Sequence, residues 1–156
     1  MSTNGNVIKL FVSVKDKGRE SKEYLELDEN GVYGDKFYAK NTERAILLTS
    51  LESYKIAQDY GIEAEFSSLG ENILMDLNPY HLTIGDTITI GEVILEITHN
   101  CTLCKSLAKV DAKLPEILKN DRGIFAKTLK NGTIKVNDKI IIKDKGKKWK
   151  KYIHLQ

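Results

Sequence analysis

The sequence predicts a single mainly-β domain that closes into a barrel and carries about two short helical regions. The longest apolar runs are strand-sized and rich in β-branched residues, as in VIKLFVSV at residues 7–14 and VILEI at residues 93–97. Asn-Gly and Gly-Asp pairs separate such runs at intervals typical of turns. A chain of 156 residues, with 41% hydrophobic and 29% charged residues, fits one domain of this kind and its core.

In the first half of the chain we expect an opening strand, a hairpin, a buried strand and a helix. The strand covers residues 7–14. Alternating apolar residues then lead to Asn30–Gly31, which is a strong hairpin signal. The run RAILLTS at residues 44–50 is typical of a buried strand, and Ser50 is the expected N-cap of a helix that reaches Tyr60.

In the second half the β character returns. Residues 71–77 and 82–99 hold isoleucine, valine and threonine runs broken by glycine turns. Pro115 is placed to open a short helix, PEILKN. The segment 123–143 is expected to fold as strand, hairpin at Asn131–Gly132, strand, turn and strand.

Charge is unevenly distributed along the chain. The segment from Lys143 to Gln156 has six lysines and one aspartate, a charge of +5, and since the whole chain carries +2 the rest carries −3. We therefore expect a domain at residues 1–143 and a basic, solvated C-terminal tail at residues 144–156. Nucleic-acid binding through this tail is a minor alternative, because no RNA-binding or helix-turn-helix signature accompanies it.

The sequence shows no secretory signal and no apolar run long enough to span a membrane. With only two cysteines, the expectation is a cytoplasmic protein with reduced thiols and no membrane association.

The segment EITHNCTLCKSL, residues 96–107, holds both cysteines, Cys101 and Cys104, and one histidine, His99. A structural zinc site needs four ligands, and the chain lacks a second Cys-x-x-Cys. A thioredoxin-like redox pair needs βαβ surroundings, whereas the flanking segments indicate a β-meander. Both sites are therefore weak hypotheses.

A single activated thiol fits the segment better. If Thr102 caps the following helix, Cys104 lies in its first turn, where free N–H groups favour a thiolate, and Lys105 adds a nearby cation. Such a thiolate can bind a soft metal, carry a persulfide or attack an electrophile. A buried structural cysteine is the alternative that the motif alone leaves open.

Four blocks of sequence occur in a characteristic order, namely GVYGDKFYAKNTERAILLTS, LGENILM, LTIGDTITIGEVILEIT with a later cysteine, and GIFAKTLKNGTIKVNDKIII. Their order and spacing resemble the MOSC domain, which forms the C-terminal part of molybdenum cofactor sulfurases and also occurs as small stand-alone bacterial proteins. The resemblance runs from about Val7 to Lys143 and covers Gly34–Asp35, Arg44, Gly70–Glu71–Asn72, Gly85–Asp86 and Gly91.

The family's single characteristic cysteine falls on Cys104, so the resemblance implies that Cys104 is the catalytic thiol and the metal ligand. Cys101 has no counterpart, and we expect it to be a resolving or auxiliary thiol. The chain departs from the family pattern at Phe37, where a histidine is common, and at Ala45, where a glutamine is common. The run HNCTL also replaces a Gln-Pro-Arg-like run before the cysteine.

The resemblance implies a MOSC-type β-barrel with a few short helices and a ligand cleft near the cysteine. It further implies binding of molybdenum cofactor, or sulfur transfer to metal–sulfur centres. Arg44, Lys36 and Lys105 are suited to hold a phosphate, and Asn72 to donate from its amide. Arg44 pairing with Asp35 or Glu71 in a structural network, and Asn72 serving only a turn, are the competing interpretations.

Three function classes follow from this resemblance. The first is a cofactor-binding or sulfur-carrier protein, whose expected partners are a cysteine desulfurase and molybdenum enzymes. Pyridoxal phosphate is expected only on that partner desulfurase. The others are a non-catalytic cofactor-delivery module and a molybdenum-dependent reductase of N-hydroxylated compounds, so enzymatic activity is left open.

Overall fold

The computed structural model describes residues 2–101 and 105–143. Its strands are β1 Ser2–Val14, β2 Gly18–Lys22, β3 Tyr24–Asp28, β4 Gly31–Val32, β5 Ile46–Ser50, β6 Ile73–Met75, β7 Thr87–Ile90, β8 Val93–Asn100, β9 Ile124–Lys130, β10 Gly132–Lys135 and β11 Lys139–Lys143. The helices are the 3₁₀-helix η1 Thr42–Arg44 and the α-helices α1 Leu51–Asp59, α2 Lys105–Val110 and α3 Leu114–Ile117.

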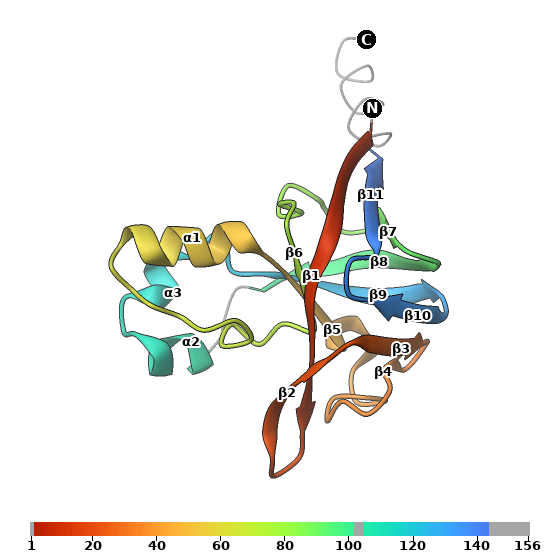
Figure 1. Cartoon of the computed structure of the whole chain (residues 1–156), viewed down its shortest axis with the longest axis horizontal. Helices are drawn as coiled ribbons and strands as arrows, with labels where there is room; N and C mark the ends of the chain where they lie inside the picture. Colours follow the sequence, from red (N-terminus) through yellow and green to blue (C-terminus); the bar gives the residue numbers. More distant parts are fainter. Residues whose placement is uncertain (1, 102–104, 144–156) are drawn as a thin grey trace.

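Seven strands close into a barrel, in the order β11-β7-β8-β9-β5-β6-β1, with β11 pairing back to β1. The first strand makes this closure possible because it is thirteen residues long. Its N-terminal half pairs with β11, its middle with β6 and its C-terminal half with β2, so β1 crosses the whole molecule (Figure 1). The predicted mainly-β barrel is confirmed.

The barrel interior is filled by alternate residues of its strands. Ile46 and Leu48 of β5 point into this core, whereas Leu47 between them points to the outer side. The core is made of isoleucine, valine and leucine side chains with almost no exposure, such as Val7, Leu10, Ile73, Ile88, Leu95, Ile97, Ile124 and Ile140. This close-packed interior makes the barrel wall a rigid support for groups on its outer face.

A second sheet, β10-β3-β4, covers part of the barrel, and it overturns one expected connection. The Asn131–Gly132 pair does not fold β9 and β10 back on each other as a hairpin, because β10 pairs with β3 while β9 pairs with β8 and β5. Ile134 thereby joins Leu25 and Leu27 in the main core. The hairpin predicted near Asn30–Gly31 is confirmed as β3–β4.

The helices form a layer on the outer side of the barrel (Figure 1). Ser50 is the N-cap of α1, as predicted, with its hydroxyl accepting from the Glu52 N–H at 3.0 Å. Tyr54 and Ala57 of α1 pack with Leu74 of β6, Leu107 of α2, Leu114 of α3 and Leu118, which directly follows α3. This cluster fixes the segment between α1 and β6, which borders the candidate site.

The strand predicted to begin at Arg44 begins two residues later, at Ile46. Asn41 caps the short helix η1 by accepting from the Glu43 N–H at 3.1 Å, so Arg44 ends a helical turn. The correction matters because it places the Arg44 side chain at the exposed edge of a loop and not on a buried strand.

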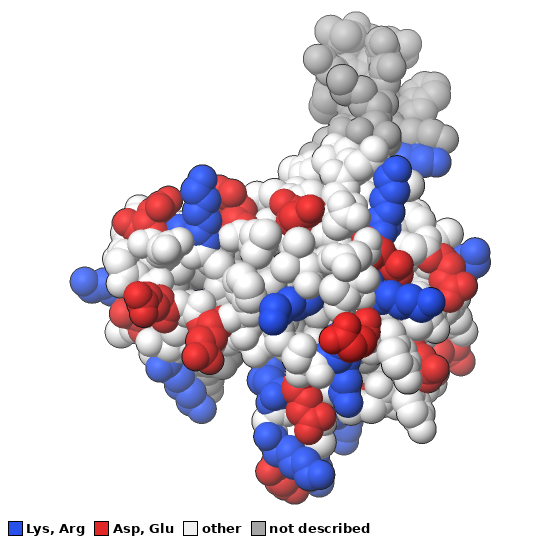
Figure 2. All heavy atoms as spheres, in the orientation of Figure 1, with Lys and Arg blue, Asp and Glu red and all other residues white. Residues whose placement is uncertain are grey.

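Among the described residues, no helix is both long and apolar enough to cross a membrane. On the face that Figure 2 shows, Lys and Arg side chains are mixed with Asp and Glu side chains and separated by uncharged surface. This face therefore has no extended region of one charge sign. A local excess of positive or negative side chains elsewhere on the molecule would indicate a binding site for an oppositely charged ligand.

Candidate functional site

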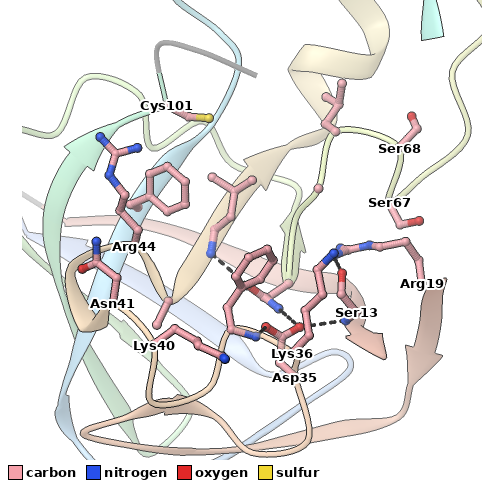
Figure 3. A pocket seen from close by; sticks show the side chains of 17 residues that line it. Ser13, Arg19, Asp35, Lys36, Lys40, Asn41, Arg44, Ser67, Ser68 and Cys101 are labelled. Atoms are coloured by element: carbon pink, nitrogen blue, oxygen red, sulfur yellow. Dashed lines mark hydrogen bonds between the residues drawn. The ribbon is translucent and has the colours of Figure 1, made fainter. Parts of the chain in front are cut away.

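A cavity of about 580 Å³ lies on the outer face of the barrel wall (Figure 3). Its floor runs across neighbouring strands, from Phe125 on β9 through Leu47 on β5 to Ser13 on β1 and Arg19 on β2. One side is formed by the segment Ser67–Gly70 that follows α1. The cavity therefore collects side chains from segments far apart in the sequence.

Asp35 anchors the loop that closes the lower edge of the cavity. Its carboxylate is buried and accepts three hydrogen bonds, from the Ser13 N–H at 2.7 Å, the Phe37 N–H at 3.1 Å and the Asn72 amide at 3.3 Å. The Lys36 N–H also donates to the Ser13 carbonyl at 2.7 Å. These bonds satisfy Asp35 within the protein and fix the loop against β1.

Asn72 lines the cavity and is almost fully buried. Its amide oxygen accepts from the Leu47 N–H at 3.0 Å, and its amide nitrogen donates to the Phe11 carbonyl at 3.2 Å and to Asp35. Both N–H groups of the amide thus donate to protein atoms. Asn72 ties β5, β1 and the Asp35 loop together at the point where the cavity crosses the sheet.

In the described part of the chain, four cationic side chains line the cavity, namely Arg19, Lys36, Lys40 and Arg44, and one carboxylate, Asp35. The Arg44 guanidinium lies over the Phe125 ring, 5.5 Å from its centroid, and the Lys36 ammonium lies 5.0 Å from the Phe37 centroid. Among the described residues, no carboxylate is within ion-pair distance of these four cations. The cavity is therefore a place where an anionic ligand gains charge compensation.

Among the described residues, Arg44 does not pair with Asp35 or Glu71, which was the competing interpretation of this residue. Arg19, from the β2 strand, occupies that position. Arg19 donates to the Ser13 hydroxyl at 2.5 Å and to the Glu71 carbonyl. The negative charges of the Asp35 and Glu71 carboxylates also act on its guanidinium. Burial lowers the pKa of the Arg19 guanidinium from its ordinary value, but an arginine stays charged in a protein.

Glu71 is completely buried behind the Ser67–Gly70 wall. One carboxylate oxygen accepts from the Tyr54 hydroxyl at 2.6 Å and from the Ser67 N–H at 3.1 Å, while the other, Oε1, has no partner among the described residues. Burial raises the pKa of Glu71, and it raises the pKa of the Tyr54 hydroxyl as well. The pair holds the cavity wall from behind, since the Leu69 N–H also donates to Tyr54.

Cys101 lines the cavity at the end formed by β8 and β9. It is buried, and its N–H donates to the Gly123 carbonyl at 3.0 Å, which continues the β8–β9 pairing past Asn100. Cys104 and the proposed cap Thr102 lie outside the described residues, as does the side chain of Lys105, whose backbone begins α2. Four predicted site residues, Lys36, Arg44, Asn72 and Cys101, thus meet in one cavity.

Within residues 2–101 and 105–143, no three His, Cys, Asp or Glu side chains come together as a metal site. His81 is exposed in the segment between β6 and β7, and His99 is partly buried on β8. In the described part of the chain, the cavity groups suited to bind an anion or react with sulfur are the four cations and the Cys101 thiol.

The sequence profile of the MOSC domain matches residues 32–141. The chain belongs to the MOSC domain family. The match extends from β4 to β11, and the β1 and β2 strands that complete the cavity precede it. No curated protein matches this MOSC chain in sequence.

Solved structures share the fold of this MOSC chain at low sequence identity. The YuaD protein from Bacillus subtilis is 16% identical and superposes with a TM-score of 0.80, covering 91% of this chain and 97% of its own. YiiM from Escherichia coli is 19% identical with a TM-score of 0.67, covering 90% and 70%, and YiiM from Geobacillus stearothermophilus is 14% identical with a TM-score of 0.66, covering 91% and 74%. Likeness at this identity shows the fold alone.

Several cavity residues escaped the sequence reasoning. Arg19 lies in a charged strand, GRESK, where arginine is unremarkable, and only the pairing of β2 with β1 brings it to the cavity. Lys40, Ser67 and Phe125 come from a loop, a turn and a strand that carry no binding motif of their own. Ser67 has one distinguishing feature, a positive φ of 79°, which sequence alone does not reveal.

Proposed function

We propose that this MOSC chain binds molybdenum cofactor, or a related anionic ligand that bears sulfur, in the cavity beside Cys101. Cys104 would hold the molybdenum or carry a persulfide, and Cys101 would serve as the auxiliary thiol. The observation that supports this proposal most directly is the cavity itself, which combines four cations, two aromatic rings and the Cys101 sulfur in about 580 Å³. That volume lies within the range of about 300–1,000 Å³ typical of cofactor sites.

The residues present fit such a group. Arg44 and Lys36 are exposed cations at the edge of the cavity and would compensate a phosphate. Phe37 and Phe125 offer ring faces beside these cations for a planar heterocycle. Asn72 would act by holding the floor in shape, because its amide N–H groups are already engaged.

When bound, molybdenum cofactor would supply redox chemistry and a metal with affinity for sulfur. The chain's own part would be to orient the ligand with its anionic end on the cations and its sulfur-reactive end towards Cys101. Lys105, with which α2 begins, is the cation that we propose to favour the thiolate of Cys104, its close neighbour in sequence. The buried Tyr54–Glu71 pair would keep the cavity wall fixed during exchange of the ligand.

For sulfur transfer, the partner implied is a cysteine desulfurase, which would bring pyridoxal phosphate and deliver sulfur to Cys104. A molybdenum enzyme would be the acceptor. Such exchange requires reduced thiols, and we therefore propose a cytoplasmic setting.

Elemental and mass analysis of the protein, purified under reducing conditions from a molybdenum-replete host, tests the proposal. We expect molybdenum or extra sulfur bound to the wild-type chain. Persulfide labelling should survive in Cys101→Ser and vanish in Cys104→Ser. Labelling that follows Cys101 instead would overturn the assignment of the two thiols.

The same preparation separates the remaining function classes. Turnover of a hydroxylamine substrate with a reducing system would identify a molybdenum-dependent reductase. Stoichiometric molybdenum and pterin without turnover would identify a cofactor-delivery module. If the purified wild-type protein carries no molybdenum and no extra sulfur, the proposed function is refuted.

A further inference from the structure

Arg19 has binding capacity that the protein does not use. A guanidinium offers five N–H donors in a planar fork. Among the described residues, Arg19 makes two hydrogen bonds, to the Ser13 hydroxyl and the Glu71 carbonyl, and its Nε–H has no acceptor. Figure 3 shows its side chain reaching over Ser13 at the end of the cavity opposite Cys101. An oxyanion entering this end would find a fixed cation with donors to spare.

The two carboxylates near Arg19 differ in how far the protein satisfies them. Asp35 accepts three hydrogen bonds, spread over both of its oxygens. Glu71 is the more deeply buried of the two and accepts only through Oε2, which leaves Oε1 without a donor in the described part of the chain. An ionised Glu71 therefore depends on the positive charge of Arg19 more than Asp35 does.

Among the described residues, the positive charge that acts on Glu71 is that of Arg19. Besides burial, the groups that act on its carboxylate are the Tyr54 hydroxyl from α1, the backbone N–H of Glu71 itself, the Ser67 N–H from the cavity wall and Arg19 from β2. Tyr80, from the segment between β6 and β7, feels the charge of Glu71, and burial keeps its hydroxyl neutral by raising its pKa. The negative charges of Asp35 and Glu71 both act on the Arg19 guanidinium.

We propose that Arg19 binds a phosphate-type oxyanion of the ligand and that Glu71 takes up one proton, on Oε1, when it does so. The inference rests on the proposed function, because it takes the same cavity as the ligand site. A bound oxyanion compensates the charge of Arg19 and repels the Glu71 carboxylate, so the neutral acid becomes the stable form. The proton comes from bulk solvent, and no bond other than O–H is made.

The coupling has a definite sign. Because anion binding raises the pKa of Glu71, the anion binds more tightly to the protein with Glu71 protonated. Affinity is therefore highest below the titration midpoint of Glu71 in the free protein and falls as the pH rises through that midpoint. A charge within about 4–6 Å shifts a carboxyl pKa by about one unit or more. A shift of about one unit corresponds to a roughly tenfold change in affinity.

Carbon-detected NMR of the Glu71 carboxyl tests the inference on the wild-type protein. Sulfate is the probe because, as the anion of a strong acid, it does not itself take up protons over the pH range in which the raised pKa of Glu71 lies. The Glu71 signal is assigned by its loss in Glu71→Gln. At constant ionic strength, we expect saturating sulfate to move the Glu71 midpoint upward by about one pH unit. An unmoved midpoint, or no sulfate binding, would overturn the proposal.

Two strand-matched variants identify the anion-binding residue. Arg19→Met should weaken sulfate binding at least tenfold, whereas Lys22→Met removes a charge from the same strand, outside the cavity, and should leave it unchanged. Equal affinities in the two variants would refute the role of Arg19. If Arg19→Met does not fold, Arg19→Lys and the wild-type titration decide. None of these measurements involves molybdenum or the cysteines, so they fail independently of the proposed function.

Discussion

Replacing Asn72 by alanine separates a structural role of this side chain from a role in ligand contact. The substitution removes three hydrogen bonds of 3.0, 3.2 and 3.3 Å and leaves the Leu47 N–H and the Phe11 carbonyl without these partners in a buried place. Each buried group left unsatisfied costs about 1–3 kcal/mol. Because the adjoining cavity can admit water to part of the gap, we expect a loss of about 2–4 kcal/mol in the free energy of unfolding.

Urea denaturation followed by circular dichroism measures this loss as a lower midpoint at an unchanged m-value. In a chain of this size the same loss lowers Tm by about 5–15 °C. Asn41→Ala is the matched control, because Asn41 also lines the cavity but is exposed and accepts only from the Glu43 N–H. We expect that control to cost about 0.5–1 kcal/mol.

A loss in Asn72→Ala no larger than that in Asn41→Ala would refute the reasoning. It would mean that the three hydrogen bonds contribute little net stability and that Asn72 is free to serve a ligand. Loss of molybdenum or sulfur loading at unchanged stability would support direct ligand contact instead.

Three further predictions use other parts of the structure. Glu71→Gln should flatten the pH dependence of the free energy of unfolding, measured by urea titration at several pH values. The pKa of Glu71 is raised in the folded state. Ionisation of Glu71 therefore destabilises the wild-type fold increasingly as the pH rises from the unfolded-state pKa to the folded-state pKa, and has no effect below the unfolded-state pKa. Gly91→Ala should lower the free energy of unfolding by about 1–3 kcal/mol, and more than Gly85→Ala. Both glycines have positive φ, but only at Gly91 would a Cβ meet the Asp138 carboxylate, at 2.6 Å. Arg44→Met should change stability by less than about 0.5 kcal/mol while reducing cofactor loading, since Arg44 is exposed at the cavity edge.

The elements that the sequence predicted correctly are those whose signal is local. The β-branched runs, the cap at Ser50 and the hairpin near Asn30–Gly31 each depend on neighbouring residues only. The Asn131–Gly132 hairpin failed because the choice of partner strand is not local. Burial of Ile134 with the apolar residues of β3 decides it.

For the site, the resemblance brought Lys36, Arg44 and Asn72 together, and they do line one cavity. It could not supply Arg19, whose place depends on how β2 pairs with β1. Nor could it show that Glu71, a charged residue between Gly70 and Asn72, is fully buried, because burial is a property of the folded chain.

The pairing of the first strand with the last described one has a consequence for when the site can form. Ser2 to Asn6 pair with Lys139 to Lys143, and β1 also carries Ser13 and the partner strand of Arg19. During synthesis on the ribosome, the N-terminal half of β1 therefore stays unpaired until β11 has emerged, and only then can the barrel close. A ligand that needs the finished cavity would be loaded into a completed polypeptide, and any protein that delivers it would meet a folded client, not a nascent one.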